Sequence, residues 1–362
     1  MDLSLRGALW IISAGVIAAG LYYLREPLTQ LAMAFILWLT IHGLSLRIKR
    51  YVPQIPRWLP LPLAIVIVLG LVSLIIYVMA SNIGSLASNA KGYGARLDEI
   101  VAHAYVGLGL AGVPPTVGDL LARVDPALLV GEIGSALQNL LSNTVFILIF
   151  LGFMFPAVGS LSRKMDLIFT EDDSRQNVRE MVASIRGSME RYLYVQTVAS
   201  LIITVLTFIT LEAIGLDNAL FWSFLIFFLN FIPTIGSIVA VALPTAFALV
   251  QFPTLAPVAF VALGVGVWQF IIGNFVQPRM TGESLNLATL VVLLALAVWG
   301  AIWGIPGAFL AAPLTVMLMI VLAQFESTRW IAILLSADGK PTPHDPDPPA
   351  TPTKVEATLE TG

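Results

Sequence analysis

Two long apolar segments near the C-terminal end of the chain are each interrupted by proline, at residues 230–236 (Asn-Phe-Ile-Pro-Thr-Ile-Gly) and 303–307 (Trp-Gly-Ile-Pro-Gly). Each break lies in an apolar stretch of about thirty residues or more, whereas roughly 20 residues cross a bilayer once, so each stretch can enter the membrane and turn back. Lipid cannot satisfy the N–H and C=O groups freed at a break, so such backbone is tolerated only where protein buries it or where it lines a cavity. The two breaks therefore indicate a transport pathway.

The composition is that of an integral membrane protein. Of the 362 residues, 58% are hydrophobic and 11% are charged, against about 25% charged residues in an ordinary soluble domain. The chain has no cysteine, which excludes disulfides, thiol nucleophiles and cysteine-bound metals. Its net charge is -3, and its 19 Lys and Arg residues lie mostly at the ends of apolar runs, so we expect no nucleic-acid partner. We predict an all-α polytopic protein that lies in the lipid bilayer.

The basic residues predict how the chain is oriented in the membrane. The apolar runs lie at 8–24, 28–46, 61–80, 140–158, 193–212, 219–250, 255–277 and 285–325. Four basic residues follow the second run and six lie between residues 163 and 191, so both of these segments are cytoplasmic by the positive-inside rule. We therefore expect both termini inside, with about six full transmembrane helices plus two re-entrant hairpins, or eight spans.

This topology divides the chain into five parts. Residues 1–80 form the first three spans, 81–139 a set of external interfacial helices, and 140–192 the fourth span followed by a cytoplasmic amphipathic helix. Residues 193–335 form a transport core with two broken hairpins, and residues 336–362, rich in Pro, Thr and Asp, form a disordered cytoplasmic tail. A separate substrate-binding domain is the alternative for 81–139.

The two broken segments are expected to point in opposite directions. The fifth span runs from the basic inside to the outside, so the segment 219–250 begins outside and breaks at Pro233. The span 255–277 returns to the inside, so the last segment begins inside and breaks at Gly304 and Pro306. Opposed units of this kind are typical of the inverted repeats of secondary transporters. Eight ordinary spans with proline kinks are the alternative, and they predict the same termini.

Polar side chains in the apolar runs are the candidate solute contacts. They are Asn230, Thr234, Ser237, Gln269, Asn274 and Gln277. Asn274 and Gln277 are three residues apart and share a face of a regular helix. Polar groups in a membrane segment usually face the bundle interior, where they line a cavity or hold helices together, and both readings stay open here.

Acidic groups are the candidates for coupling to protons or cations. They are Glu212, Asp217 and Glu283, and all three lie beside the apolar runs rather than within them. The chain carries no zinc-binding His-Glu-x-x-His helix, nucleophile elbow or phosphate-binding glycine loop, and it has three histidines in all. We therefore expect no catalytic site, no cofactor and no metal site.

Three blocks of sequence resemble the autoinducer-2 exporter family. They are residues 230–236 with Pro244, residues 274–282 with the Gln277-Pro278 pair, and residues 304–314 (Gly-Ile-Pro-Gly-Ala-Phe-Leu-Ala-Ala-Pro-Leu). The resemblance covers residues 20–335. It implies a bacterial inner-membrane carrier or exporter, with some members linked to release of autoinducer-2 and others to cation/proton exchange. It also implies a homo-oligomer such as a pentamer and an elevator-like movement of the C-terminal half.

The breaks and hinges of this pathway are expected at proline and glycine. They are Pro233, Gly236, Pro244, Pro278, Gly282, Gly304, Pro306, Gly307 and Pro313. Many relatives carry a glutamate immediately before the Gly-Asn pair that matches Gly273-Asn274, whereas this chain has Ile272. An uncharged pathway suits a small neutral polar solute, so the leading hypothesis is an exporter of small polar organic molecules that works by alternating access. The alternatives are a cation/proton antiporter and a non-transporting membrane scaffold or regulatory subunit.

Overall fold

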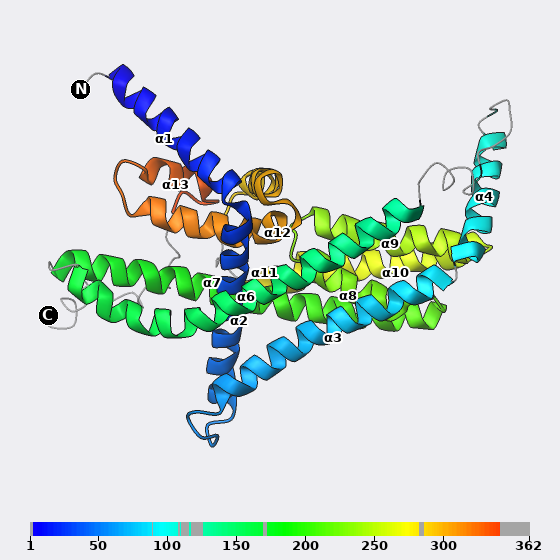
Figure 1. Cartoon of the computed structure of the whole chain (residues 1–362), viewed down its shortest axis with the longest axis horizontal. Helices are drawn as coiled ribbons and strands as arrows, with labels where there is room; N and C mark the ends of the chain where they lie inside the picture. Colours follow the sequence, from blue (N-terminus) through cyan, green and yellow to red (C-terminus); the bar gives the residue numbers. More distant parts are fainter. Residues whose placement is uncertain are drawn as a thin grey trace, which may run out of the picture.

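The computed structural model describes residues 3–88, 90–107, 109, 116, 126–168, 172–281 and 286–340, and over these residues the chain is built from helices (Figure 1). Five helices are long and apolar enough to cross a membrane, and three shorter apolar helices accompany them. The described residues pair as β structure only at one bridge, between Leu287 and Ser336. The predicted all-α polytopic fold is confirmed.

The helices follow one another along the chain with these bounds: α1 (Leu3–Tyr23), α2 (Arg25–Tyr51), α3 (Pro60–Ser88), α4 (Ala90–Gly107), α6 (Pro126–Ile168), α7 (Asp172–Ile214), α8 (Ala219–Leu229), α9 (Ile235–Gln251), α10 (Leu255–Ile271), the π-helix η1 (Ile272–Val276), α11 (Gln277–Thr281), α12 (Thr289–Ala323) and α13 (Arg329–Leu335). The segment expected to hold external interfacial helices thus begins within α3, which continues to Ser88, and includes α4. The expected cytoplasmic helix and the fifth span are one uninterrupted helix, α7.

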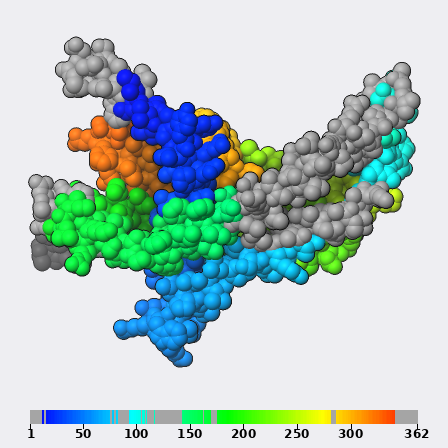
Figure 2. Space-filling view, viewed as in Figure 1, coloured from blue at the N-terminus to red at the C-terminus, as the bar shows by residue number. Residues whose placement is uncertain are grey.

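Helix α2 is the central packing element of the N-terminal half. It contacts α3, α6, α7 and α12, and Ala34, Leu39 and Ile41 on it are fully buried (Figure 1). Elsewhere, large apolar side chains face outward: Tyr23 is 83% exposed and Ile305 is 79% exposed. The outline is open, with α1 and the α2–α3 connection projecting on opposite sides (Figure 2). Exposed apolar surface on this scale is the surface that a bilayer covers.

The first broken segment forms a tight helical hairpin of α8 and α9. Its arms lie side by side, as shown by the rings of Trp222 on α8 and Phe247 on α9, whose centroids are 5.0 Å apart. The helix ends at Leu229, and Thr234 takes a positive φ of 60°, so the chain reverses around Pro233 as expected. Gly236 is required at the turn, because a Cβ there would overlap the carbonyl group of Leu229. At the open end, the side chain of Gln251 accepts from the Asp217 amide at 2.7 Å and donates to the Gly215 carbonyl at 2.8 Å.

The second broken segment, α12, also folds back on itself. Gly304 has φ 66° and ψ -144°, which interrupts the helix. In a straight helix residues 299 and 315 would lie about 24 Å apart, yet the Trp299 indole donates to the Thr315 hydroxyl at 3.1 Å. Gly307 packs against the Trp299 carbonyl, and a Cβ at Gly307 would overlap it. The start of this segment is tied to the end of α13, where the Ala288 amide donates to the Leu335 carbonyl at 3.1 Å.

The turn of the first hairpin packs on the second. Phe231 stacks on Phe309, with ring centroids 4.8 Å apart and an interplanar angle of 19°. Ile232 packs against the cluster of Leu296 and Ala311 on the two arms of α12. The two breaks, 70 residues apart in sequence, are therefore brought together in space by apolar contacts.

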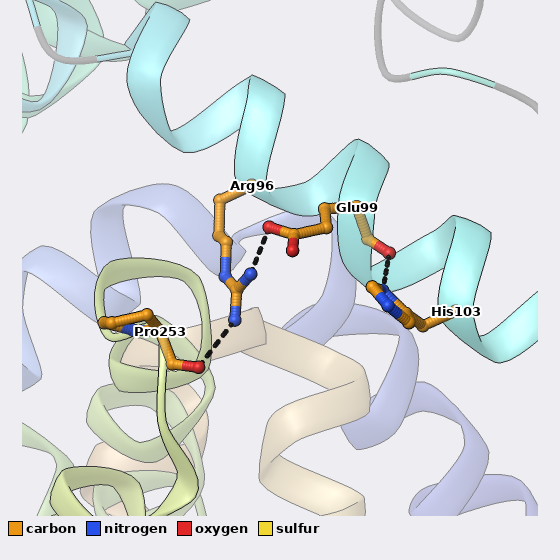
Figure 3. A network of polar contacts seen from close by, with 4 residues as sticks. All are labelled: Arg96, Glu99, His103 and Pro253. Carbon is orange, nitrogen blue, oxygen red and sulfur yellow. Dashed lines mark hydrogen bonds and ion pairs between the residues drawn. The ribbon is translucent and has the colours of Figure 1, made fainter.

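Helix α4 docks on the open end of the first hairpin (Figure 3). The Arg96 guanidinium pairs with the Glu99 carboxylate and donates to the Pro253 carbonyl at 3.1 Å, and this pairing lowers the pKa of the Glu99 carboxyl. His103 Nδ1 lies 2.8 Å from the Glu99 carbonyl oxygen. One turn earlier, the Tyr93 hydroxyl donates to Asp217 at 3.0 Å and its ring meets Phe247 edge to face. Helix α4 thus braces the open end of the first hairpin.

The contact at Gly236 predicts that Gly236→Ala destabilises the protein by about 1–3 kcal/mol, because the arms of the first hairpin must separate to admit the methyl group. Gly266→Ala is the matched control, since a Cβ at Gly266 in α10 meets no atom within 4 Å. The measurement is the unfolding midpoint of the purified proteins in detergent. Equal midpoints for the two variants would contradict the tight turn.

Candidate functional site

Four side-chain amides from separate helices converge where the first hairpin breaks, and we call them the amide cluster. Its members are Gln196 of α7, Asn230 at the end of α8, Gln269 of α10 and Gln277 of α11. Gln269 Nε2 donates to Asn230 Oδ1 at 2.9 Å, and Gln277 Nε2 donates to Gln196 Oε1 at 2.8 Å. Gln196 Nε2 donates to the backbone carbonyl of Asn230 at 2.6 Å. The broken turn is therefore held by uncharged polar groups.

The hydrogen bond from Gln196 follows from the break itself. In a continuous helix the Asn230 carbonyl would accept from the amide of residue 234, but Thr234 has left the helical conformation. The freed carbonyl needs another donor, because a buried polar group without a partner is unfavourable. Gln196, which is 4% exposed, provides it.

The π-helix η1 explains how α10 and α11 both reach the cluster. Gln269 and Gln277 are eight residues apart, which places them about 80° apart around a regular helix. A π turn acts as a one-residue insertion, so the pair behaves as if it were seven residues apart and lies within about 20° of one face. The Ile272–Val276 turn therefore aligns two amides that an ordinary helix would separate.

One atom of the cluster has no partner. Asn230 Nδ2 is buried, and among the described residues no acceptor lies within hydrogen-bonding distance of it. The oxygen of the same side chain is occupied by Gln269, which fixes the orientation of the amide. A buried amide nitrogen with two N–H groups is then available to an acceptor oxygen that the described residues do not provide.

The structure brings together three of the six predicted solute contacts: Asn230, Gln269 and Gln277. Thr234 is exposed at the turn, and its carbonyl accepts from the Ser237 hydroxyl at 2.8 Å. Asn274 is exposed and donates to the Phe270 carbonyl of its own helix at 2.9 Å. Asn274 lies in the π turn and does not reach the amide cluster in this structure, whereas Gln277, three residues on, bonds Gln196.

Two of the predicted acids, Asp217 and Glu212, lie away from the amide cluster. Asp217 is bonded to Tyr93 of α4 at the open end of the first hairpin, and Glu212 is exposed near the end of α7. Glu283 and Gly282 fall outside the described residues. No group of three or more His, Cys, Asp or Glu side chains that could hold a metal ion occurs in the described part of the chain.

The predicted hinges divide into two kinds. Residues 230–234 around Pro233 and Gly304 beside Pro306 form the breaks, whereas the helix continues through Pro244 in α9 and through Pro313 in α12. Both of these prolines are buried in the second arm of their hairpins. Pro278 is exposed in α11, immediately after Gln277.

Sequence reasoning missed Gln196, although a signal was present. Gln196, Ser200 and Thr204 recur at steps of four within the apolar run 193–212, followed by Thr207, and all four are buried on α7. A polar stripe at helical spacing within an apolar helix predicts a face that meets other protein rather than lipid. This stripe lies more than twenty residues before the first break and was not among the predicted solute contacts.

The π turn yields a prediction. Deletion of Gly273 should convert η1 into regular helix and leave Gln269 and Gln277 on one face, so the protein should fold and reach the membrane at normal abundance. Deletion of Ala262 in the regular part of α10 should lower the folded amount several-fold, because it rotates half of α10 by about 100°. Monodisperse protein recovered by size-exclusion chromatography measures both. If the Gly273 deletion variant is recovered in an amount as low as the Ala262 deletion variant, this account of the π turn is contradicted.

Comparison with known proteins agrees with these features. The model of the AI-2E family transporters matches residues 11–327. A putative transport protein of Haemophilus influenzae is 30% identical over 293 residues, which cover 78% of this chain and 82% of that protein. The AI-2 transport protein TqsA of Escherichia coli is 28% identical over 342 residues, covering 92% and 97% of the two chains. A sodium-lithium/proton antiporter of Halobacillus andaensis is 28% identical over 193 residues, 53% of each chain. The resemblance seen in the sequence blocks is confirmed, and the chain belongs to the AI-2E transporter family.

Proposed function

We propose that this chain is a transporter of the bacterial inner membrane that exports small, polar, uncharged organic molecules of the autoinducer-2 type. The observation that carries the proposal is the amide cluster at the break of the first hairpin, with the buried and unpaired Asn230 Nδ2. The name of the related TqsA protein as an AI-2 transport protein supports the solute class.

The lengths of the hairpin arms support a site within the membrane. Helix α8 has 11 residues and is about 16 Å long, against about 30 Å for the hydrocarbon core. A chain that enters with α8 and returns with α9 therefore turns before it has crossed. This length supports a break, with the amides that hold it, at the depth where transporters of this general kind bind their solutes.

The chemistry of the cluster favours a neutral solute. Its described members are amides, which donate and accept hydrogen bonds but carry no charge. A bare cation or anion would lose its hydration without gaining an opposite charge. A molecule that carries hydroxyl or carbonyl groups exchanges its hydrogen bonds to water for hydrogen bonds to amides at little cost in free energy. Thr234 and Asn274, which are exposed in this conformation, are proposed to line the route to the cluster.

Alternating access requires that the hairpins move, and the contact between them suits such movement. Phe231 and Phe309 meet through ring faces, and Ile232 meets Leu296 and Ala311 through apolar surfaces. Apolar contacts are non-directional, so they can slide or separate without leaving polar groups unpaired. The homo-oligomer and the elevator-like movement stay predictions from the family resemblance.

Gln269→Leu tests the proposed site. It removes the donor to Asn230 Oδ1 at similar side-chain volume and should lower the flux of labelled autoinducer-2 into liposomes at least tenfold, since an unpaired buried polar atom is unfavourable by about 1–3 kcal/mol. Thr245→Val in α9 is the matched control, because the Thr245 hydroxyl bonds only to its own helix in the described structure. Normal flux from Gln269→Leu at equal protein abundance would remove the amide cluster from the pathway.

The Halobacillus relative favours cation/proton exchange as a second candidate. Such exchange needs a titrating group, and the acids considered for it are Glu212, Asp217 and Glu283. The variant with all three replaced by glutamine should retain autoinducer-2 flux under the leading proposal. If cation-driven proton movement is present in the wild type and is lost in that variant, the antiporter becomes the better description.

A further inference from the structure

Two hydrogen bonds of the amide cluster run in series through Gln196. Gln277 donates to Gln196, and Gln196 donates through its own Nε2 to the Asn230 carbonyl. The same Nε2 lies 3.4 Å from the Ser200 hydroxyl, one turn along α7. Since the oxygen of Gln196 faces a donor and its nitrogen faces a carbonyl, only one orientation of this amide satisfies both neighbours. The position of Gln277 is thus transmitted to the broken turn through Gln196.

This series of hydrogen bonds, from Gln277 through Gln196, is called the relay below, and it ends at Asn230. Its backbone oxygen accepts from Gln196 and its side-chain oxygen accepts from Gln269, so both of its acceptors are occupied. Its side-chain nitrogen is buried, and no described residue accepts from it. A buried donor without a partner destabilises a fold. Gln196 therefore holds the backbone of Asn230 and Gln269 holds its side-chain oxygen, while its side-chain N–H groups are not used by any described residue.

We propose that Gln196 is a positioning residue of the solute site, which holds the broken turn at the backbone carbonyl of Asn230, and that the transported solute presents an uncharged hydroxyl or carbonyl oxygen to Asn230 Nδ2. The proposal rests on the proposed function and deepens it by assigning the donor, the acceptor and the residue that sets them. Gln196 does not donate to the solute, because its own donors and acceptor are used within the cluster. It acts through Asn230.

The relay also explains why α7, α8 and α11 meet at this point. Gln196 is the one described side chain that bonds both the broken turn and the segment after the π-helix. When a solute engages Asn230, any shift of the turn is transmitted to Gln277 through two hydrogen bonds rather than through apolar packing. We therefore expect solute binding and the arrangement of α10–α11 to be coupled.

Gln196→Glu tests the relay through its pH dependence. The protonated carboxyl group of this variant can donate its O–H to the Asn230 carbonyl and accept from Gln277, which reproduces the wild-type pattern. The ionised group has no donor and faces the Asn230 carbonyl with a negative charge. Because burial raises the pKa of a carboxyl group, the relay should be intact at acid pH and should be lost as the pH rises through that raised value.

The experiment is equilibrium exchange of labelled autoinducer-2 across liposomes with the same pH on both sides. We expect exchange by Gln196→Glu, divided by that of the wild type at the same pH, to fall at least tenfold between pH 5 and pH 8. Gln30→Glu is the matched control, since Gln30 is an exposed amide of α2 bonded to Asn143, and its ratio should stay flat. Gln196→Leu should be inactive throughout.

The outcomes separate the two proposals. A wild type that exchanges no solute contradicts the proposed function itself. If the wild type is active, a Gln196→Glu variant that is equally active at both pH values, or inactive at both with normal abundance, overturns the positioning role. Asn230→Asp tests the donor directly, because it replaces N–H groups by acceptors and should raise the KM for autoinducer-2 at least tenfold. An unchanged KM would overturn the assignment of Asn230 as the donor.

Discussion

The constraint on which this structure depends is the need to satisfy backbone polar groups where a helix breaks inside a membrane. At the first break the Asn230 carbonyl loses its helical partner, and a glutamine from α7 replaces it. At both breaks the chain reverses so tightly that a glycine, Gly236 or Gly307, must lie against a carbonyl group of the opposite arm. A break made in this way keeps the freed carbonyl of the first turn paired within the protein.

The hairpins are held differently at their two ends. At the open end of the first, Gln251 bonds the backbone at Gly215 and Asp217, and α4 adds contacts from Tyr93 and Arg96. At the open end of the second, Asn286 donates to Asp338 at 2.6 Å, which ties the segment before α12 to the chain after α13. The turns meet through the Phe231–Phe309 stack and neighbouring apolar contacts. Directional bonds thus anchor the ends, and non-directional contacts join the turns, where the proposed alternating access requires movement.

Much of this arrangement could be predicted from the sequence, because the signals were local. Pro233 and Gly304 inside long apolar runs predicted where the helices reverse, and the composition predicted the all-α membrane fold. The amide cluster could be predicted only in part. The regular helical pattern gave no sign of the π turn, in which Asn274 is exposed. The polar stripe of α7 could have marked Gln196 as facing protein, but its bonds to the broken turn and to Gln277 depend on how α7 packs. Regular periodicity cannot reveal an inserted residue, nor which distant helix supplies a missing donor.

The central claim is that the turns of the two hairpins must part for solute to pass, and cross-linking them tests it most directly. The chain has no cysteine, so Phe231→Cys combined with Phe309→Cys introduces the only two thiols. We expect a short, reducible thiol cross-linker to stop autoinducer-2 flux in liposomes, and reduction to restore it, while each single cysteine variant treated in the same way keeps its flux. Full flux from the quantitatively cross-linked double variant would show that solute moves without separation of the turns and would contradict this account.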